Sequence, residues 1–366
     1  MKVILSCAGT GGHIYPAIAI ADKIMKEDPS SEILFIGTKK GMENRLVPEA
    51  GYEIKGIDAS GFNRKQLHKN VKTLADMIKG GAAVRKILKD FKPDAVIGTG
   101  GYVTGTVLSN ASKAGIPCFI HEQNVIPGMA NKMLEKYSEK VFISFEESRK
   151  YFKKADALVY SGNPIRSAFL DADKSNAKAE IGLAEDDFMI LATGGSLGAE
   201  KLNYGVMELI SSLQARGSKA KVVFVTGRMY YEEIKGKLEE SGYGMDRVIL
   251  KDYASNMPVL MAAADLIISR AGAIALSEIT VSGKPCVLIP SPNVTNNHQY
   301  WNAKALADCG AALLIEEKDL KDSFAPFTDA VAQLIENKSA LAEMAEKSRR
   351  AGKTDAVDII YKNLKI

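Results

Sequence analysis

The chain has 366 residues, of which 46% are hydrophobic and 25% are charged, and its formal net charge is +4. This composition excludes an intrinsically disordered chain, and the length predicts two domains rather than one. The four cysteines (Cys7, Cys118, Cys286 and Cys309) form no C-x-x-C pair, which argues against a disulfide framework or a thiolate zinc site. The apolar run after Met1 meets glycines too early for a signal peptide or a spanning helix, so a cytoplasmic protein is expected.

The basic residues are concentrated in the first half of the chain. Residues 1–165 carry 24 basic and 17 acidic side chains, a net charge of +7, whereas the remainder carries 24 basic and 27 acidic side chains, a net charge of −3. This asymmetry favours an anionic partner for the first half, either a membrane surface or nucleic acid. No nucleic-acid recognition module accompanies the basic residues, so nucleic acid is not expected.

Short apolar runs alternate with amphipathic stretches along most of the chain. Strands are predicted at residues 3–7, 33–36, 95–97 and 118–120, each followed by turn residues and a helical pattern. After a polar passage at residues 174–187 the rhythm begins again, with strands predicted at 188–193, 222–225, 247–250, 266–268 and 287–289. This order predicts an α/β fold of two Rossmann-like domains, each built on a parallel sheet.

The boundary between the domains is expected near Gly162-Asn163-Pro164. It gives an N-terminal domain at residues 1–164 and a C-terminal domain at residues 165–351. The apolar residues near the end of the chain recur with helical spacing, so residues 352–366 are expected to form a helix that packs back on the first domain. The two sheets are expected to face each other across a cleft.

Each domain begins with a strand, a glycine-rich turn and a helix. Such a turn can bind an anion through free backbone N–H groups and the helix dipole, although a single turn of this kind is equally often structural. The first turn, Gly9-Thr10-Gly11-Gly12, has Ile14 where a dinucleotide-binding fingerprint needs its third glycine. The second turn, at residues 194–198, lacks the Gly-Lys-Ser/Thr ending of a P-loop. A dehydrogenase and a P-loop ATPase are therefore not expected.

A third glycine-rich turn, GTGGY at residues 98–102, follows another strand of the first domain. It should open on the same carboxyl edge of the sheet as the first turn, where open α/β sheets bind their ligands. Two turns on one rim suit a ligand with its own diphosphate, and the turn at Ser196 suits the phosphates of a nucleotide.

Eight motifs follow one another between residues 9 and 302. They are GTGGHIYPA at 9–17, GTGGY at 98–102, HEQN at 121–124, GNPIR at 162–166, GGSLGA at 194–199, SRAGA at 269–273, SE at 277–278 and QYWN at 299–302. In this order they strongly resemble the MurG family, the N-acetylglucosaminyltransferases of peptidoglycan synthesis. The resemblance implies a GT-B fold and inverting transfer of N-acetylglucosamine from UDP-N-acetylglucosamine to the muramoyl 4-hydroxyl of undecaprenyl-diphospho-N-acetylmuramoyl-pentapeptide. It implies no cofactor and no strictly required metal.

The resemblance also assigns residues to the two substrates. His13 is expected to be the base that takes the proton of the acceptor hydroxyl, because imidazole suits that task near neutral pH; the alternative is a histidine that orients the turn. The expected acceptor contacts are Gly12, His13, Gly100, Gly101 and Tyr102. The expected donor contacts are Thr10, Gly11, Gly12, Asn124, Arg166, Ser196, Ala254, Arg270, Ala273, Glu278 and Gln299.

Several of these donor contacts have a specific expected chemistry. Glu278 would accept hydrogen bonds from both ribose hydroxyls, the alternative being a solvated acid in the first helical turn. Ser196 would receive the diphosphate, and Arg166 and Arg270 would add positive charge as UDP departs. The alternatives are a surface ion pair for either arginine and a hinge residue for Arg166.

The remaining donor contacts follow from motif position. Asn124 would bind a sugar hydroxyl, or instead form an Asx turn before the following Pro-Gly pair. Ala254 would offer its backbone to uracil. Where some family members carry a glutamine pair before Tyr-Trp-Asn, this chain has His298-Gln299, so only Gln299 is expected to contact the sugar.

Residues 71–92 mix apolar side chains, including Ile78, Val84 and Leu88, with six lysines and arginines. This composition suits a basic amphipathic surface resting on anionic lipid, the alternative being an ordinary helix with a buried apolar face. A lipid-linked acceptor and the +7 charge favour the first interpretation. Peripheral binding to the cytoplasmic face of the cell membrane is therefore expected.

Two further features leave alternatives open. Asp171-Ala172-Asp173 matches the Asp-x-Asp that holds a divalent metal in another class of glycosyltransferase, but it falls in a polar, linker-like stretch and no metal site is expected. The two-domain architecture and the donor are shared by non-hydrolysing UDP-N-acetylglucosamine 2-epimerases, and a non-enzymatic UDP-sugar-binding protein is the other alternative.

Overall fold

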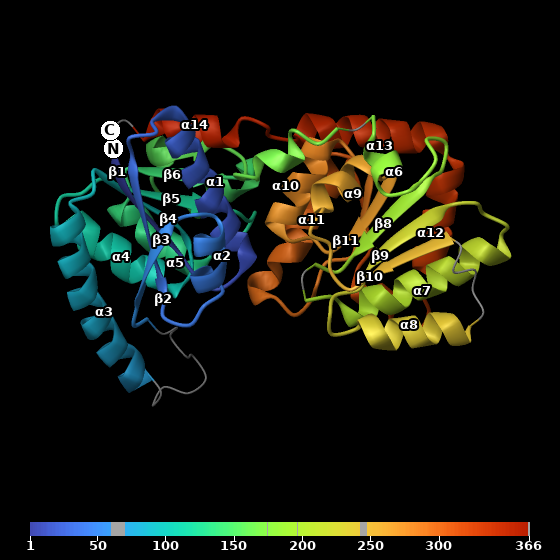
Figure 1. Ribbon diagram of the computed structural model, residues 1–366, viewed down its shortest axis with the longest axis horizontal. Helices are drawn as coiled ribbons and strands as arrows, with labels where there is room; N and C mark the ends of the chain where they lie inside the picture. The colour runs from blue at the N-terminus through green and yellow to red at the C-terminus, as the bar shows by residue number, and fades with distance from the viewer. Residues whose placement is uncertain (60–69, 174, 196, 242–246, 365–366) are drawn as a thin grey trace. The chain divides into compact units, whose positions relative to one another are not determined.

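The computed structural model describes residues 1–59, 70–173, 175–195, 197–241 and 247–364, with side chains at all of these except 70–75 and 77. The chain divides into two compact units. Unit 1 consists of Met1–Arg166 and Asp355–Ile366, and unit 2 of Ser167–Thr354. Each unit alternates strands with helices around one parallel sheet (Figure 1), so the α/β prediction with two parallel sheets is confirmed.

The sheet of unit 1 has seven strands in the order β3-β2-β1-β4-β5-β6-β7, all parallel. Its strands are β1 (Lys2–Cys7), β2 (Glu32–Thr38), β3 (Glu53–Ile57), β4 (Ala95–Gly100), β5 (Cys118–Glu122), β6 (Lys140–Ile143) and β7 (Leu158–Tyr160). The order runs outward from β1 on one side and from β4 on the other. The junction between β1 and β4 is therefore the topological switch point, where ligands of open α/β sheets bind.

Helices cover both faces of this sheet. They are α1 (Gly11–Glu27), α2 (Glu43–Glu49), α3 (Asn70–Phe91), α4 (Tyr102–Lys113), α5 (Met129–Leu134) and α14 (Ala356–Asn363), with short 3-10 turns at Glu135–Tyr137, Glu146–Tyr151 and Ala155–Ala157. Residues from α1, α2 and α14 share one buried cluster, and residues from α3, α4 and α5 share another. Both faces of the central strands are therefore covered, which explains why every residue of β4 is buried.

Helix α14 lies against α1 (Figure 1) although the two are separated by more than 300 residues of sequence. Ile360 and Leu364 are buried in the same cluster as Ile14 and Ile18 of α1. The end of the chain therefore contributes to the core that supports the N-terminal glycine turn.

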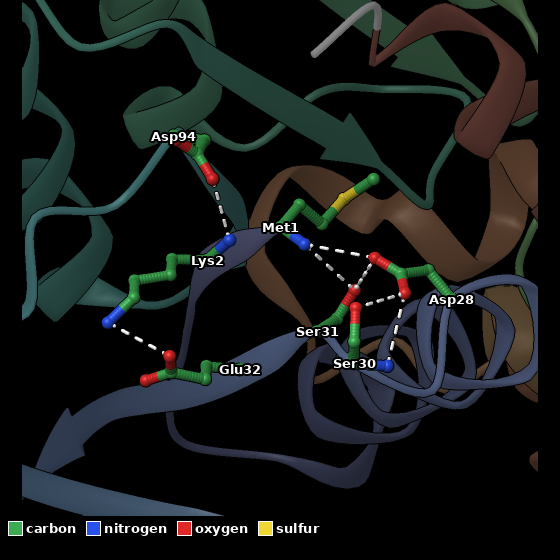
Figure 2. Close-up of polar contacts among 7 residues, drawn as sticks. All are labelled: Met1, Lys2, Asp28, Ser30, Ser31, Glu32 and Asp94. Atoms are coloured by element: carbon green, nitrogen blue, oxygen red, sulfur yellow. Dashed lines mark hydrogen bonds and ion pairs between the residues drawn. The ribbon is translucent and has the colours of Figure 1, made fainter.

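The start of β1 is fixed at the amino edge of the sheet, as Figure 2 shows. The amino group of Met1 forms an ion pair with Asp28 at 3.0 Å, and the backbone N–H of Lys2 donates to Asp94 at 2.7 Å. Hydrogen bonds from Ser30, and then from the Met1 amino group, hold the pKa of Asp28 below its usual range. Strand β1, which ends at the glycine turn, is thus held at its start to the segments that precede its two neighbours in the sheet, β2 and β4.

Helix α3 carries the apolar side chains of residues 71–92 that were expected to contact the membrane, and it buries some of them. Val84 and Leu88 belong to a buried cluster with residues of β1 and β4, whereas Ile78 is 65% exposed. Val71, Leu74 and Met77 lie outside the described side chains. For Val84 and Leu88 the alternative interpretation, an ordinary helix with a buried apolar face, is therefore correct.

The sheet of unit 2 has six parallel strands in the order β10-β9-β8-β11-β12-β13. They are β8 (Met189–Thr193), β9 (Lys221–Val225), β10 (Val248–Lys251), β11 (Leu266–Ser269), β12 (Cys286–Leu288) and β13 (Ala312–Leu314). The switch point of this sheet lies between β8 and β11, so the turns after these two strands adjoin at its carboxyl edge.

The helices of unit 2 follow the same alternation. They are α6 (Ala177–Glu180), α7 (Glu200–Ala215), α8 (Tyr231–Glu240), α9 (Met257–Ala263), α10 (Ala273–Ser282), α11 (His298–Asp308), α12 (Ala325–Glu336) and α13 (Lys338–Ala351), with 3-10 turns at Ser167–Phe169, Thr295–Asn297 and Glu317–Leu320. Side chains of α7, α8 and α12 share a large buried cluster with the strands, including Phe224 and Phe327. This core supports the turns at the carboxyl edge.

Candidate active site

Two glycine turns of unit 1 meet at the switch point between β1 and β4. The pairing of these strands shifts register after Ser6, so that Cys7 lies opposite Gly100 rather than Thr99. The backbone N–H of Ala8 then donates to the carbonyl of Gly100 at 3.1 Å. The register shift ends the regular pairing of the two strands, and the hydrogen bond between Ala8 and Gly100 joins the turn after β1 directly to the turn after β4.

His13 lies in the first turn of α1, and both glycine turns hold it. Its Nδ1 is 2.9 Å from the carbonyl oxygen of Ala8, and its own carbonyl accepts a hydrogen bond from the Thr99 hydroxyl at 2.7 Å. A carbonyl oxygen only accepts, so the proton of the neutral ring lies on Nδ1 and the lone pair lies on Nε2. His13 therefore presents a proton acceptor on the side of the ring away from Ala8.

Gly100 packs on the His13 ring so closely that no side chain fits between them. A Cβ on Gly100 would lie 2.5 Å from Cδ2 and 2.8 Å from Nε2 of His13. Gly100 and the next residue, Gly101, have φ values of +130° and +93°, which L-residues with a side chain rarely adopt. Of the predicted acceptor contacts, Gly100 thus lies against His13 and Gly101 lies against Ala8, since a Cβ on Gly101 would be 2.7 Å from the Ala8 carbonyl oxygen. Tyr102 begins α4 with its side chain 68% exposed.

The N-terminus of α1 offers donors and a nearby cation. Thr10 is the N-cap residue, and its side chain caps no N–H group of the first turn in the described part of the chain. The N–H groups of Gly11 and Gly12 precede the first helical hydrogen bonds, so they suit an anion. The guanidinium of Arg166 lies over the Tyr15 ring, 4.9 Å from its centroid, which places its charge beside α1.

The HEQN motif at the end of β5 is mostly buried and joins the ends of four strands. His121 Nε2 donates to the carbonyl of Gly162 at 3.0 Å, and its Nδ1 accepts from Gln123 at 3.0 Å. Gln123 also donates to the carbonyl of Thr99 at 2.7 Å, and Thr99 holds His13. Burial lowers the pKa of His121 to about 4, so its ring is neutral at physiological pH. His121 and Gln123 therefore support the site rather than contact a substrate.

Asn124 is the half-buried member of this motif. Its backbone N–H and its side-chain amide both donate to one oxygen of Glu122, at 2.9 and 3.2 Å. The other oxygen of Glu122 accepts from Asn131 and from the N–H of Gly128. Glu122 thus fixes the loop that carries Asn124. This role of Glu122 was not predicted from the sequence.

The glycine turn of unit 2 follows β8 and precedes α7. Ser196, the predicted diphosphate contact, lies outside the described residues. Gly198 has φ +77° and packs on Gly227, since a Cβ on Gly227 would lie 2.4 Å from the backbone nitrogen of Gly198. This close approach of two backbones fixes the turn at the carboxyl end of β9 as well as β8.

Gln299 lies at the carboxyl ends of β11 and β12. Its Oε1 accepts hydrogen bonds from the backbone N–H groups of Ser291 at 2.9 Å and Ala271 at 3.3 Å. Because the oxygen is held by the backbone, the side-chain NH₂ group is directed away from these strands as a donor. The neighbouring His298 donates from Nδ1 to the carbonyl of Thr295 at 2.9 Å.

Arg270 forms an internal ion pair. Its guanidinium donates to the carbonyl of Ile289 at 2.9 Å and to the carboxylate of Glu317, and the two charged side chains are only 12% and 17% exposed. Sequence reasoning did not identify Glu317, because an acid in a polar segment gives no signal of its partner. This pair ties the segment before Ser291, and with it Gln299, to the end of β11.

We expect Glu317→Gln to destabilise unit 2 by about 1–3 kcal/mol, because it leaves a mostly buried guanidinium without its counter-charge. Through Ile289 and Ser291 it should also weaken binding of the donor that the resemblance implies, UDP-N-acetylglucosamine, about tenfold, equivalent to ~1.4 kcal/mol. Denaturant unfolding and calorimetric titration measure the two effects. The control is Glu316→Gln, which removes a more exposed ion pair with Lys318 and should change either quantity little.

The other predicted donor contacts surround the same edge of unit 2. Ala273 is the first residue of α10, and Glu278 lies in the second turn of that helix rather than the first. Glu278 is half-buried, so it is not the solvated first-turn acid considered as its alternative. Ala254 is buried in the segment after β10.

The Asp-x-Asp match has a local structural use. The carboxylate of Asp173 accepts from the backbone N–H and hydroxyl of Ser175, at 2.9 and 2.6 Å, and from Asn176 at 2.8 Å. Hydrogen bonds, chiefly from the side chain of Ser175, lower the pKa of Asp173.

Among the described residues no group of three or more His, Cys, Asp or Glu side chains could hold a metal ion. Over the same residues, no helix has the length and apolar character needed to cross a membrane.

Comparison with known proteins identifies the class to which these two units belong. The glycosyltransferase family 28 N-terminal domain matches residues 3–143, and the family 28 C-terminal domain matches residues 189–360. The UDP-N-acetylglucosamine--N-acetylmuramyl-(pentapeptide) pyrophosphoryl-undecaprenol N-acetylglucosamine transferase of Thermoanaerobacter sp. (strain X514) is 44% identical over 100% of this chain and 99% of its own length.

Solved structures agree with this assignment. The structure of Acinetobacter baumannii MurG superposes with a TM-score of 0.79 at 27% identity, over 100% of this chain and 99% of that chain. The UDP-GlcNAc 2-epimerase from Neisseria meningitidis shares the fold, with a TM-score of 0.71 at 17% identity over 100% and 99% of the two chains. The chain therefore belongs to glycosyltransferase family 28 and, within it, to the MurG family, and its fold is of the GT-B type.

Proposed function

We propose that this chain transfers N-acetylglucosamine from UDP-N-acetylglucosamine to the muramoyl 4-hydroxyl of undecaprenyl-diphospho-N-acetylmuramoyl-pentapeptide, in peptidoglycan synthesis. The observation that carries the proposal is the full-length identity of 44% to a curated transferase with this activity in its name. The fixed orientation of His13 supports it, because the reaction needs a proton acceptor at the acceptor hydroxyl.

In the proposed reaction the acceptor hydroxyl oxygen attacks the anomeric carbon of the donor sugar. The bond between that carbon and the β-phosphate oxygen breaks, its electron pair leaves with UDP, and the configuration inverts. The hydroxyl proton passes to Nε2 of His13, which holds the lone pair because Nδ1 donates to Ala8. Gly12, Gly100, Gly101 and Tyr102 would contact the acceptor around this imidazole.

Unit 2 would hold the donor. The side-chain NH₂ group of Gln299 would donate to sugar hydroxyls, Glu278 would accept from the ribose, and the backbone of Ala254 would meet uracil. Ser196 and Ala273 would bind the diphosphate at the turns after β8 and β11. Thr10, Gly11, Gly12, Asn124 and Arg166 of unit 1 are also proposed donor contacts, with Arg166 stabilising charge on departing UDP. Arg270 would act through its ion pair with Glu317.

The acceptor assay tests this function. With UDP-N-acetylglucosamine and a lipid-linked muramoyl acceptor, we expect release of UDP in equal amount to the disaccharide lipid formed. Formation of the manno epimer from donor alone would instead support the epimerase. Donor binding without any UDP release in the presence of acceptor would support a UDP-sugar-binding protein.

We also propose that unit 1 rests on the anionic cytoplasmic face of the cell membrane, where its acceptor is held. Helices α3 and α5 of this unit carry three large exposed apolar side chains in the described part of the chain: Ile78 of α3, and Met129 and Met133 of α5. Basic residues accompany them, including Lys132, which lies 4.6 Å from the centroid of the Tyr151 ring. Apolar side chains with flanking cations suit the boundary between headgroups and acyl chains.

The double variant Ile78→Ser and Met133→Ser should lower binding to phosphatidylglycerol vesicles about tenfold, because it removes two apolar contacts worth ~1 kcal/mol or less each. Vesicle co-sedimentation measures this effect. The control is Leu170→Ser, which changes a 40% exposed leucine of unit 2 and should leave vesicle binding unchanged. Equal binding of the wild type to neutral and anionic vesicles would refute the anionic preference.

A further inference from the structure

Glu43 is a buried carboxylate beside the active-site turn. It is the first residue of α2, and its side chain is fully buried. Two glycines make room for it, because a Cβ on Gly37 would lie 2.6 Å from Glu43 Cγ and a Cβ on Gly41 would lie 2.1 Å from Oε2. Burying an ionised carboxylate is costly unless its oxygens accept hydrogen bonds, so the partners of Glu43 show what this side chain holds in place.

Both oxygens of Glu43 accept hydrogen bonds from backbone or hydroxyl donors. Oε1 accepts from the N–H of Thr38 at 2.8 Å and from its hydroxyl at 2.6 Å, and Oε2 accepts from the N–H of Gly9 at 3.2 Å. In the described part of the chain no lysine or arginine forms an ion pair with Glu43, and the neighbouring Lys39 pairs with Asp58. Three donors and no acceptor around the carboxyl group correspond to its ionised form.

The bond from Gly9 connects Glu43 to His13 through one peptide group. The N–H of Gly9 and the carbonyl of Ala8 belong to the same planar unit. The N–H end donates to Glu43, and the carbonyl end accepts from His13 Nδ1 at 2.9 Å. Carboxylate, peptide and imidazole thus form a continuous line of hydrogen bonds that ends at the unprotonated Nε2.

We propose that Glu43 is a positioning residue for His13, acting through the Ala8–Gly9 peptide in the way that a carboxylate orients a catalytic histidine directly. The inference rests on the proposed function in one respect, the role of His13 as the base. The negative charge polarises the peptide, so the Ala8 carbonyl becomes a stronger acceptor for the proton on Nδ1. This favours the tautomer with the lone pair on Nε2 and stabilises the imidazolium that forms when the acceptor is deprotonated.

The charge of Glu43 is also felt at the end of β1. Burial, and then the charge of Glu43, raises the pKa of the Cys7 thiol. Cys7 immediately precedes Ala8, so the carboxylate acts on the backbone segment that holds His13.

Glu43→Gln keeps the size of the side chain and removes its charge. The turn loses its charge-assisted bond to Gly9, because an amide cannot accept from Gly9 and from both Thr38 donors with the same strength. We expect kcat with the lipid acceptor to fall about 10- to 100-fold, the usual effect of removing an outer-shell partner, while KM for UDP-N-acetylglucosamine changes less than about threefold. The ring ¹⁵N shifts of His13 should change from a single Nδ1–H tautomer to a mixture.

The matched control is Thr38→Val, which removes one hydrogen bond to the same carboxylate and leaves the bond to Gly9. It should lower the melting temperature as Glu43→Gln does, yet keep the wild-type tautomer and turnover within about twofold. Equal losses of turnover in the two variants would overturn the proposal, because they would indicate a merely structural role. An Nε2–H tautomer in the wild type, which needs no variant to fold, would overturn it as well.

The same experiment separates this inference from the proposed function. A tautomer change in Glu43→Gln with turnover unaltered would leave the coupling to His13 intact and refute His13 as the base. A loss of turnover in His13 variants with no tautomer change in Glu43→Gln would leave the base assignment intact and refute the role of Glu43.

Discussion

Replacing His13 by asparagine is expected to lower turnover with the lipid acceptor by about 10²- to 10⁴-fold, the usual contribution of a general base. The amide nitrogen of asparagine takes the position of Nδ1, so it can still donate to the carbonyl of Ala8. The variant therefore keeps the hydrogen bond that holds the turn and lacks the proton acceptor at Nε2. UDP release with acceptor present measures turnover, and calorimetric titration measures donor affinity.

Donor affinity distinguishes the two roles considered for His13. If His13 is the base, His13→Asn loses turnover and binds UDP-N-acetylglucosamine nearly as tightly as the wild type. His13→Ala, which loses both the base and the bond to Ala8, should lose turnover to a similar extent and also be less stable. Near-normal turnover in His13→Asn, with poor turnover in His13→Ala, would mean that His13 only orients the turn and that the base lies elsewhere.

The sequence predicts the central strands of both sheets because these strands are buried on both faces and read as continuous apolar runs. All nine predicted runs are strands in the structure. The strands that the pattern missed lie toward the edges of the sheets or are short. β3 exposes most of its residues, β6 has four residues, and β7 and β13 have three each, so the hydrophobic signal of these four strands is too weak to detect.

The glycine turns could be located from sequence, but the contacts that give them their geometry could not. Glu43 holds Gly9 from 34 residues away, and Glu317 holds Arg270 from 47 residues away. Such partners come together only when the fold is formed, and a single acid in a polar segment resembles a solvated surface residue. The burial of Val84 and Leu88 was undecided for the same reason, since an amphipathic pattern does not say what covers the apolar face.

Gly100→Ala is expected to lower turnover by at least about 100-fold, because a displacement of ~1 Å at a catalytic group costs that much. The new Cβ would lie 2.5 Å from Cδ2 of His13, so the ring must move or the backbone of the turn must shift. Since Nδ1 is hydrogen-bonded to the carbonyl of Ala8, either movement displaces Nε2 from the position in which it would accept the hydroxyl proton. The positive φ of +130° adds strain of order 1–3 kcal/mol.

Gly115→Ala separates that strain from the contact with His13. Gly115 follows α4 in the same unit, has a φ of +76°, and a Cβ there would meet no atom within 4 Å. Both variants should lose stability in denaturant unfolding, but only Gly100→Ala should lose turnover while keeping donor affinity. Matching losses of turnover in the two variants would show that the effect is general destabilisation. Loss confined to Gly100→Ala would mean that this glycine is required because the imidazole occupies the space where any side chain would lie.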